Sequence, residues 1–347
     1  MVDVTIRGAG IFGLSIAWVC AQRGAHVRVI DPNGPGAGAS GGLVGALAPH
    51  VPENWNQKKA FQFDSLIAAS DFWANVESAG GVSSGYGRTG RLQPIADEHA
   101  LSLAKAREAS ARDLWQGLAD WRVVSADEAG AWAPHSPTGL LIHDTLSARM
   151  HPRRACQALT AALAAQKVTI VSEGDDSGPV VWCTGVAGLE ALNKQHPRTV
   201  GNGVKGQAAL LSPSKPIPAD APQLFADALH IIPHADGTVA VGSTSERDYN
   251  DATGTDHQLD EIIARAAQQV PALGEATVIQ RWAGLRPRTR SRAPMLGEWP
   301  GKPGAYIANG GFKIGFGMAP KVAEVMADLV LDDLDAIPDD FRVEASL

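Results

Sequence analysis

Cysteine, long apolar runs and clustered positive charge are all scarce in this chain. Its 347 residues include 3 cysteines, which lie far apart in the sequence inside expected helices or strands: Cys20, Cys156 and Cys183. Buried free thiols are therefore expected, rather than a disulfide framework or a metal cluster. No apolar run reaches the roughly 18 residues that a membrane helix needs, so we expect no membrane span.

The balance of charge argues against a protein that binds nucleic acid. The formal net charge is −7 and no long basic run is present, so a nucleic-acid groove is not indicated. No signal peptide is visible, and we expect a cytoplasmic protein. Glycine, in contrast, is abundant at 37 residues. This abundance indicates close backbone packing around a ligand.

The first 31 residues carry a dinucleotide-binding fingerprint. A strand expected over 2–7 runs into the turn Gly8-Ala9-Gly10-Ile11-Phe12-Gly13, a helix follows over 11–23, and a strand over 26–31 ends on Asp31. Gly8 allows the tight turn, Gly10 lets the backbone approach a pyrophosphate, and Gly13 lets the helix pack on the strand. Asp31 can accept hydrogen bonds from ribose hydroxyls, which disfavours the 2′-phosphate of NADP.

Hydrophobic periodicity separates helices from strands along the rest of the chain. Expected helices cover 57–79, 97–119, 151–166, 257–270 and 316–331. Expected strands cover 168–171, 179–183, 204–211, 229–234, 238–243, 278–286 and 304–308. The chain is thus predicted to open on a strand–helix–strand unit, to continue through β-rich material and to close on a helix.

Seven segments resemble, in the same order, the FAD-dependent amine and amino-acid oxidoreductases of the D-amino-acid oxidase superfamily, the group of glycine oxidase, sarcosine oxidase and D-amino-acid dehydrogenase. They are the turn 8–13 with Asp31, G-A-S-G at 38–41, V-V-W-C-T-G at 180–185, V-K-G-Q at 204–207, the hairpin 231–244, W-A-G-L-R-P at 282–287 and A-N-G-G-F-K-I-G at 308–315. The resemblance runs nearly end to end.

This resemblance implies the architecture. It is an α/β fold in which a discontinuous, Rossmann-like FAD-binding domain carries an α+β substrate domain built on a mostly antiparallel sheet. We expect residues 1–48, 140–206 and 280–347 in the FAD-binding domain, and 49–139 and 207–279 in the substrate domain.

The resemblance also implies FAD as the cofactor, held along its length by distant turns. Ser40 and Thr184 offer hydroxyls to phosphate or ribityl oxygens, and the start of the last helix would face the pyrimidine edge of the flavin. The expected cofactor contacts are Gly8, Gly10, Ile11, Phe12, Gly13, Asp31, Ala39, Ser40, Gly41, Thr184, Gly185, Gly310, Gly311, Phe312, Lys313, Ile314 and Gly315.

Three residues are candidates for substrate contact. In glycine oxidase-like members the arginine matching Arg286 grips the substrate carboxylate, which suits a planar guanidinium. Lys313 matches a lysine that sarcosine oxidase-like members use on the same group. His230 begins the strand where some relatives place an active-site tyrosine. A structural ion pair, a solvated loop lysine and a surface histidine are the respective alternatives, and His50 is a weaker candidate.

The reaction that the resemblance implies is oxidation of a small amine or amino acid. Hydride passes from the α-carbon to flavin N5, and water hydrolyses the resulting imine. Oxygen or another acceptor then takes the electrons. Two alternatives stay open: a tRNA wobble-uridine-modifying FAD oxidoreductase, and a flavin-binding protein without catalysis. No metal site and no nucleic-acid partner are expected.

One feature departs from the family pattern. Relatives often carry T-x-D-G-x-P after the R-P pair, whereas this chain has Arg288, Arg290 and Arg292 at alternating positions after Arg286. If the segment is extended, all four arginines share one face, which suits a more acidic or larger substrate. The equal alternative is that the three arginines after Arg286 are surface residues.

Overall fold

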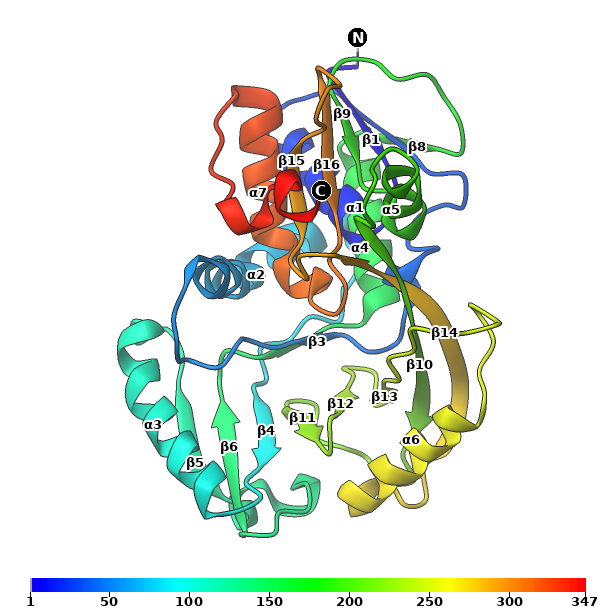
Figure 1. Ribbon diagram of the computed structural model, residues 1–347. Coiled ribbons are helices and arrows are strands. Elements are labelled where there is room, and N and C mark those ends of the chain that lie inside the picture. Colours follow the sequence, from blue (N-terminus) through cyan, green and yellow to red (C-terminus); the bar gives the residue numbers. More distant parts are fainter. Residues whose placement is uncertain (1) are drawn as a thin grey trace.

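Two β-sheets form the two halves of the molecule, as Figure 1 shows. The computed structural model describes residues 2–347. The first sheet has the strand order β15-β16-β9-β1-β2-β8, and its neighbours are parallel except for β15 and β16. Its strands are β1 (Val4–Arg7), β2 (Val27–Ile30), β8 (Thr169–Val171), β9 (Val180–Trp182), β15 (Met295–Glu298) and β16 (Ala305–Asn309).

Helices cover this sheet and join it in the main hydrophobic core. Helix α1 packs against α4 and α7, and α2 packs outside them on the same two helices. The bounds are α1 (Ile11–Gln22), α2 (Gln57–Gly80), α4 (Pro152–Ala165) and α7 (Gly315–Asp332). Because α1 is buried over nearly its whole length, its apolar run needs no amphipathic pattern.

The second sheet has the order β14-β10-β13-β12-β11-β4-β6-β5 and is antiparallel except at β11 and β4. Its strands are β4 (Arg91–Pro94), β5 (Trp121–Ser125), β6 (Leu140–Asp144), β10 (Gly201–Ser212), β11 (Gln223–Ala226), β12 (Leu229–Pro233), β13 (Val239–Gly242) and β14 (Thr277–Thr289). A short pair, β3 (Ala46–Leu47) and β7 (Ala148–Arg149), completes the β-structure.

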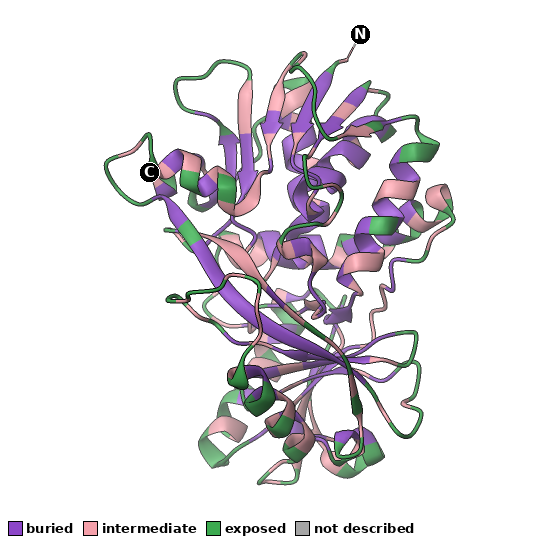
Figure 2. Ribbon diagram, turned by 90° about the vertical axis from the view of Figure 1, so that its right-hand side faces the viewer, coloured by how far each residue is buried: buried purple, intermediate pink, exposed green. Residues whose placement is uncertain are grey.

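Two helices cover the outside of the second sheet. Helix α6 (His257–Gln269) packs over β10, β12 and β13, and α3 (Glu98–Leu114) packs against β5. In Figure 2 these two helices carry much of the exposed surface, whereas the strands of the first sheet are largely buried. The long strands β10 and β14 run from the second sheet toward the first (Figure 1).

The structure confirms the predicted mixed α/β fold. Every helix and strand predicted from periodicity is present, although the helix expected over 97–119 ends at Leu114, because Gln116 (φ 53°) and Gly117 (φ 71°) adopt left-handed conformations. Periodicity missed the short elements, in which few residues repeat. They are β3, β4, β5, β6, β7, β11, β15 and α5 (Gly185–Asn193).

The expected division into domains stays a prediction. Strand β6 begins at Leu140, the first residue of a segment expected in the FAD-binding domain, yet it pairs with β4 and β5 in the second sheet. The β10–β14 ribbon likewise carries residues from both expected domains.

All three cysteines are buried free thiols. Burial raises the pKa of Cys20 and of Cys156 to about 12, so both stay protonated. Among residues 2–347, no helix is both long and apolar enough to cross a bilayer. Nor does that part of the chain bring three or more His, Cys, Asp or Glu side chains together as metal ligands.

Candidate active site

The glycine turn after β1 is held by backbone contacts that leave no room for side chains. A Cβ on Gly8 would lie 2.4 Å from the carbonyl oxygen of Cys183, and one on Gly13 would lie 1.9 Å from that of Gly8. Gly8 also has a φ of 105°. The Asp31 carboxylate accepts from Ala9 N at 2.7 Å and so ties the end of β2 to this turn.

The N-terminus of α1 offers free donors at this turn. The hydroxyl of Ser40, which is buried, accepts from Ile11 N at 2.9 Å. Phe12 N and Gly13 N have no acceptor among residues 2–347, since the N-cap residue Gly10 has no side chain and Ser40 engages only Ile11 N. Buried N–H groups without acceptors are costly, and phosphate oxygens at a helix N-terminus supply them. The residues present therefore fit the pyrophosphate of a dinucleotide.

The segment after β9 lies beside this turn. Cys183 N donates to Arg7 O at 2.7 Å, which places Thr184 next to the glycine turn. The Thr184 hydroxyl lies against Gly188, where a Cβ would come within 2.3 Å of it, and it caps no helix. Gly185 (φ 57°) begins α5, and its carbonyl accepts from Asn309 Nδ2 at 2.8 Å.

The turn 310–315, which leads from β16 into α7, lies beside the start of α1. A Cβ on Gly311 would lie 3.0 Å from Phe12 Cζ, and one on Gly315 would lie 3.6 Å from Ile11 Cγ2. Phe312 N donates to Pro287 O at 3.1 Å, which joins this turn to β14. The structure thus brings together the four segments that were expected to hold the cofactor, at 8–13, 39–41, 184–185 and 310–315.

Arg286 projects from β14 across the neighbouring strand. Its guanidinium lies over Gly206 of β10, where a Cβ would come within 1.9 Å of Arg286 Nη1. Nη1 donates to the carbonyl of Thr244 at 3.2 Å, and no carboxylate among residues 2–347 pairs with the guanidinium. Burial, partly offset by the Glu246 carboxylate, lowers the pKa of Arg286 to about 10, so it stays charged at neutral pH.

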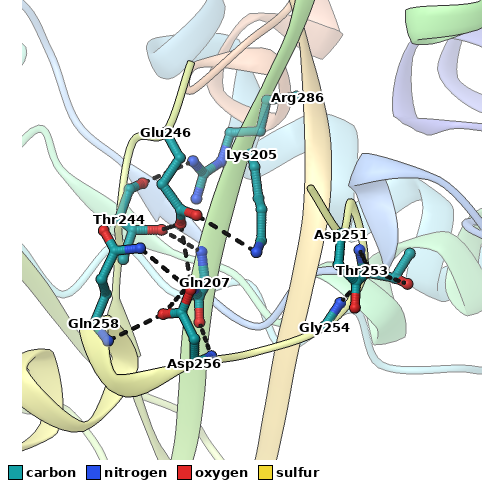
Figure 3. A network of polar contacts seen from close by, with 10 residues as sticks. All are labelled: Lys205, Gln207, Thr244, Glu246, Asp251, Thr253, Gly254, Asp256, Gln258 and Arg286. Atoms are coloured by element: carbon teal, nitrogen blue, oxygen red, sulfur yellow. Dashed lines mark hydrogen bonds and ion pairs between the residues drawn. The ribbon is translucent and has the colours of Figure 1, made fainter. Parts of the chain in front are cut away.

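A polar network fixes the strands beneath this arginine (Figure 3). The Gln207 amide donates to Glu246 Oε1 at 3.0 Å and to Asp256 Oδ1 at 2.9 Å. Lys205 Nζ lies 3.4 Å from Glu246 Oε2, and both side chains are largely buried. The Thr244 hydroxyl accepts from Gln207 N at 2.8 Å. Because Glu246 is engaged by these partners, it leaves the Arg286 guanidinium free for another anion.

His230 lies on the same face of the second sheet as Arg286, and Lys313 is exposed on the turn 310–315 that Phe312 N joins to β14. Burial, followed by repulsion from Arg286 and Arg288, lowers the pKa of Lys313, whose ammonium pairs with no carboxylate within residues 2–347. Burial is also the main cause that lowers the pKa of His230 to about 3, and Arg91, Lys313 and Arg286 add to it. His230 is therefore a neutral imidazole, and its buried Nδ1 has no hydrogen-bond partner.

The condition for a row of four arginines, an extended segment through residue 292, is not met. Arg286 and Arg288 share a face of β14, but the strand ends at Thr289. Arg290 lies in the following turn and donates to the carbonyl of Leu347, while Arg292 has a φ of 65°. The weaker candidate His50 lies elsewhere, and its ring contacts the Gln62 side chain.

Sequence reasoning missed Arg91 and the network around Gln207. Arg91 belongs to β4, within a stretch that looked like turns, and no local pattern shows that this strand lies near His230. The segment V-K-G-Q at 204–207 resembles a family segment, but the resemblance does not indicate the polar network that Gln207 joins. Its glycine, which makes room for Arg286, was the available signal.

The fold and these residues define a dinucleotide-dependent enzyme in which a cation without a carboxylate partner, Arg286, lies on a strand joined to the last cofactor segment. The family described as FAD dependent oxidoreductase (DAO) matches residues 3–329. The chain belongs to this family and is an FAD-dependent oxidoreductase.

Relatives and neighbours agree with this assignment. The uncharacterized oxidoreductase YurR of Bacillus subtilis is 27% identical, over 98% of both chains. Glycine oxidase of Pseudomonas putida is 28% identical, over 94% of both chains. The solved structure of iminodiacetate oxidase from Chelativorans sp. BNC1 superposes with a TM-score of 0.86 at 22% identity, covering 98% of both chains, and shows that the fold is shared.

Proposed function

We propose that this enzyme oxidises an amino acid or a similar small amine at the carbon that bears its carboxylate. The observation that supports this most is Arg286, a half-buried cation without a carboxylate partner. It is joined through Pro287, the next residue of β14, to the turn 310–315. The glycine oxidase relatives act on an amino acid, which agrees with a site built for a carboxylate.

In this proposal Arg286, Lys313 and His230 bind the substrate and orient it. Arg286 takes the substrate carboxylate through its free guanidinium nitrogens, and the Lys313 ammonium contributes the second positive charge. His230, being neutral, adds no repulsion toward the amine and offers Nδ1 to it as a hydrogen-bond partner. Catalysis is then a matter of positioning the α-carbon, with the amine in its uncharged form.

The turns at 8–13, 39–41, 184–185 and 310–315 would hold FAD, with Asp31 on the ribose side. When bound there, FAD would supply the acceptor for the α-hydrogen and its electron pair, and the resulting imine would be hydrolysed by water. The N–H groups at the start of α7, where no side chain caps the helix, would be available to negative charge on the reduced flavin.

Anaerobic bleaching of the bound flavin tests the proposal. Purified protein is mixed with glycine, sarcosine, proline and both enantiomers of several amino acids, and the loss of visible flavin absorbance is followed. At least one of these compounds should reduce the flavin. If none does, although FAD is retained, the protein binds flavin without this catalysis, and a tRNA-shift assay then tests the wobble-uridine alternative.

A pair of variants on one strand isolates the role of Arg286. Arg286→Gln should raise the KM of the best substrate by about 100-fold or more, since a charge-assisted pair is lost. Arg281→Gln is the matched control, because Arg281 lies on the same strand in an exposed pair with Asp260. Equal kinetics in the two variants would refute the assignment.

A further inference from the structure

Strand β10 separates Arg286 from the polar network that lies beneath it. Arg286 pairs with Val204 across the β10–β14 ladder, and paired residues in a sheet point to the same face. The guanidinium lies over Gly206, on that same face. Because side chains alternate along a strand, Lys205 and Gln207 point to the opposite face. The guanidinium and the side chains of the buried network drawn in Figure 3 therefore belong to opposite faces of β10.

Thr244 contacts both the guanidinium and the network. It follows β13 and continues alongside β10, where its N–H donates to Gln207 O at 3.3 Å. Its carbonyl oxygen accepts from Arg286 Nη1 at 3.2 Å. Its hydroxyl accepts from Gln207 N at 2.8 Å and donates to the Glu246 carboxylate. Thr244 is only 9% exposed, and all three of its polar groups bond to protein.

The Glu246 carboxylate that accepts from this hydroxyl is itself fixed. Its Oε1 accepts from Gln207 Nε2 at 3.0 Å, and its Oε2 lies 3.4 Å from Lys205 Nζ. Lys205 N donates to Glu246 O and Glu246 N donates to Lys205 O, both at 2.9 Å. The Gln207 amide also exchanges two hydrogen bonds of 2.9 Å with Asp256, the N-cap residue of α6. Strand β10 and helix α6 therefore hold the group that fixes Thr244.

The contact with Thr244 decides which nitrogens of Arg286 are free. The Thr244 carbonyl takes a proton of Nη1, and neither Nε nor Nη2 has an acceptor among residues 2–347. Nε and Nη2 form one edge of the planar guanidinium, and two parallel N–H groups match the two oxygens of a carboxylate. A guanidinium that is held by Nη1 keeps this edge in one direction. A donor pair that is already ordered binds its anion more tightly than a mobile one.

We propose that Thr244 is a positioning residue for the carboxylate of the substrate. The network on one face of β10 fixes the Thr244 hydroxyl, and the Thr244 carbonyl aims the Nε–Nη2 edge of Arg286 on the other face. Thr244 does not touch the substrate and acts only through Arg286. The inference rests on the proposed function and adds to it a residue that governs binding, while the oxidation step is unchanged.

Two variants of Thr244 test the hydroxyl in the intact holoenzyme. Thr244→Val keeps the shape of the side chain and removes the hydroxyl, whereas Thr244→Ser keeps the hydroxyl. Each protein is titrated with acetate, propionate and benzoate, and the change in the flavin spectrum gives the dissociation constant of the acid that the wild type binds most tightly. Thr244→Val should raise this constant about 10-fold, and Thr244→Ser should stay within about threefold of the wild type.

Thr253→Val is the matched control. The Thr253 hydroxyl also donates to a carboxylate two residues away, that of Asp251, but in an exposed turn without contact to Arg286. The control should bind the acid as the wild type does. Equal binding by Thr244→Val and Thr253→Val would overturn the inference.

A second background separates positioning from general damage to the fold. In Arg286→Gln the guanidinium is gone, so Thr244→Val should change acid binding by less than about twofold there. The same loss with and without Arg286 would show that Thr244 acts on the fold and not through the arginine, which contradicts the inference. So would acid binding that is equal in the wild type and in Arg286→Gln.

Amines that reduce the flavin give an independent readout. Thr244→Val should raise KM about 10-fold and keep kcat within about threefold, because the carboxylate is placed less well while the oxidation is unaltered. A fall in kcat with an unchanged KM would contradict the role in binding. If no amine reduces the flavin, the proposed function fails, and the acid titrations still decide the role of Thr244.

A charge-free network decides the matter if Thr244→Val does not fold. Lys205→Gln with Glu246→Gln removes both buried charges together and keeps an amide oxygen for the Thr244 hydroxyl. Because the aim of Arg286 depends on that hydrogen bond, acid binding should weaken by less than about threefold. A loss of about 10-fold or more would show that the buried charges, and not the hydroxyl, control Arg286, and the inference would be wrong.

Discussion

At the scale of single residues, the position of Arg286 depends on the absence of a side chain at Gly206, which lies beneath it. The guanidinium lies where the side chain of any residue other than glycine at 206 would stand, and the carbonyl of Thr244 takes one of its protons. The polar network of Lys205, Gln207 and Glu246 is buried below and keeps this strand in register. The arginine is therefore placed by strand packing rather than by an ion pair.

Gly206→Ala should displace Arg286 without touching its charge. The added methyl would overlap the guanidinium, so we expect the KM of a carboxylate substrate to rise roughly 10-fold or more. Gly274→Ala is the control, because Gly274 is exposed, has a helical φ of −60° and lies outside the pocket. Steady-state kinetics of both variants check this, and an unchanged KM for Gly206→Ala would show that the guanidinium does not bind substrate.

A second buried histidine gives the fold a dependence on pH. Burial, with a smaller contribution from His151, lowers the pKa of His234 to about 4, and its Nε2 donates to Leu43 O at 3.2 Å. The unfolded chain takes up this proton near pH 6.5 and the folded chain does not. His234 therefore contributes stability above pH 6.5 that is lost as the pH falls toward 4.

His234→Gln should flatten that dependence. Between pH 7 and pH 5 we expect the free energy of unfolding of the variant to fall by about 1–2 kcal/mol less than that of the wild type. Urea unfolding of the holoenzyme at the two pH values measures it. His99→Gln, an exposed change on α3, should leave the wild-type slope in place; a slope equally steep in His234→Gln would refute the prediction.

At the scale of elements, the N-terminus of α1 gathers the cofactor segments. Ser40 comes from the short turn 39–41 and bonds to Ile11 N, so this loop and the helix are ordered together. The following N–H groups remain available to an anion. A helix that begins in a buried place without a side-chain cap is stable when a ligand completes it.

Ser40→Ala should weaken FAD binding by about 5- to 10-fold, because Ile11 N loses its acceptor and the loop its anchor. Ser15→Ala is a close control, since Ser15 is also buried on α1 and its hydroxyl has no partner. Titration of deflavinated protein with FAD, followed by flavin fluorescence, gives both dissociation constants. The hypothesis fails if the two variants bind FAD equally well.

The sequence indicated most elements, and the exceptions have a physical cause. Helices such as α2 and α4 repeat their apolar positions over several turns, and the glycine turn carries its own steric signature. Strands β4 and β11 are only four residues long, and their pairing joins Arg91 to Gln223 across more than a hundred residues. No local pattern reports such a pairing, so Arg91 could be found only once the strands were placed.

At the scale of the whole molecule, FAD would lie where segments from all parts of the chain meet. The N–H groups of Phe12 and Gly13, in buried residues at this meeting point, have no acceptor among residues 2–347. If FAD binds the folded state and not the unfolded chain, it raises the stability of the folded state by mass action.

Adding FAD to deflavinated protein should therefore raise its melting temperature. At 100 times the dissociation constant the gain is about 2.7 kcal/mol. FMN, which lacks the adenosine and the second phosphate ester, should stabilise much less, because the fingerprint turn with Asp31 serves that half. Differential scanning fluorimetry compares the two. Equal shifts with FMN and FAD would contradict the role given to the glycine turn.

The ribbon of β10 and β14 has one consequence for the evolution of substrate preference in such an enzyme. Arg286 is covalently next to Pro287, whose carbonyl binds Phe312 of the turn before α7. Arg286 is thus linked to the expected cofactor segment 310–315 through a single peptide unit. Substitutions on the other strands of the second sheet therefore leave this link between Arg286 and the turn before α7 in place.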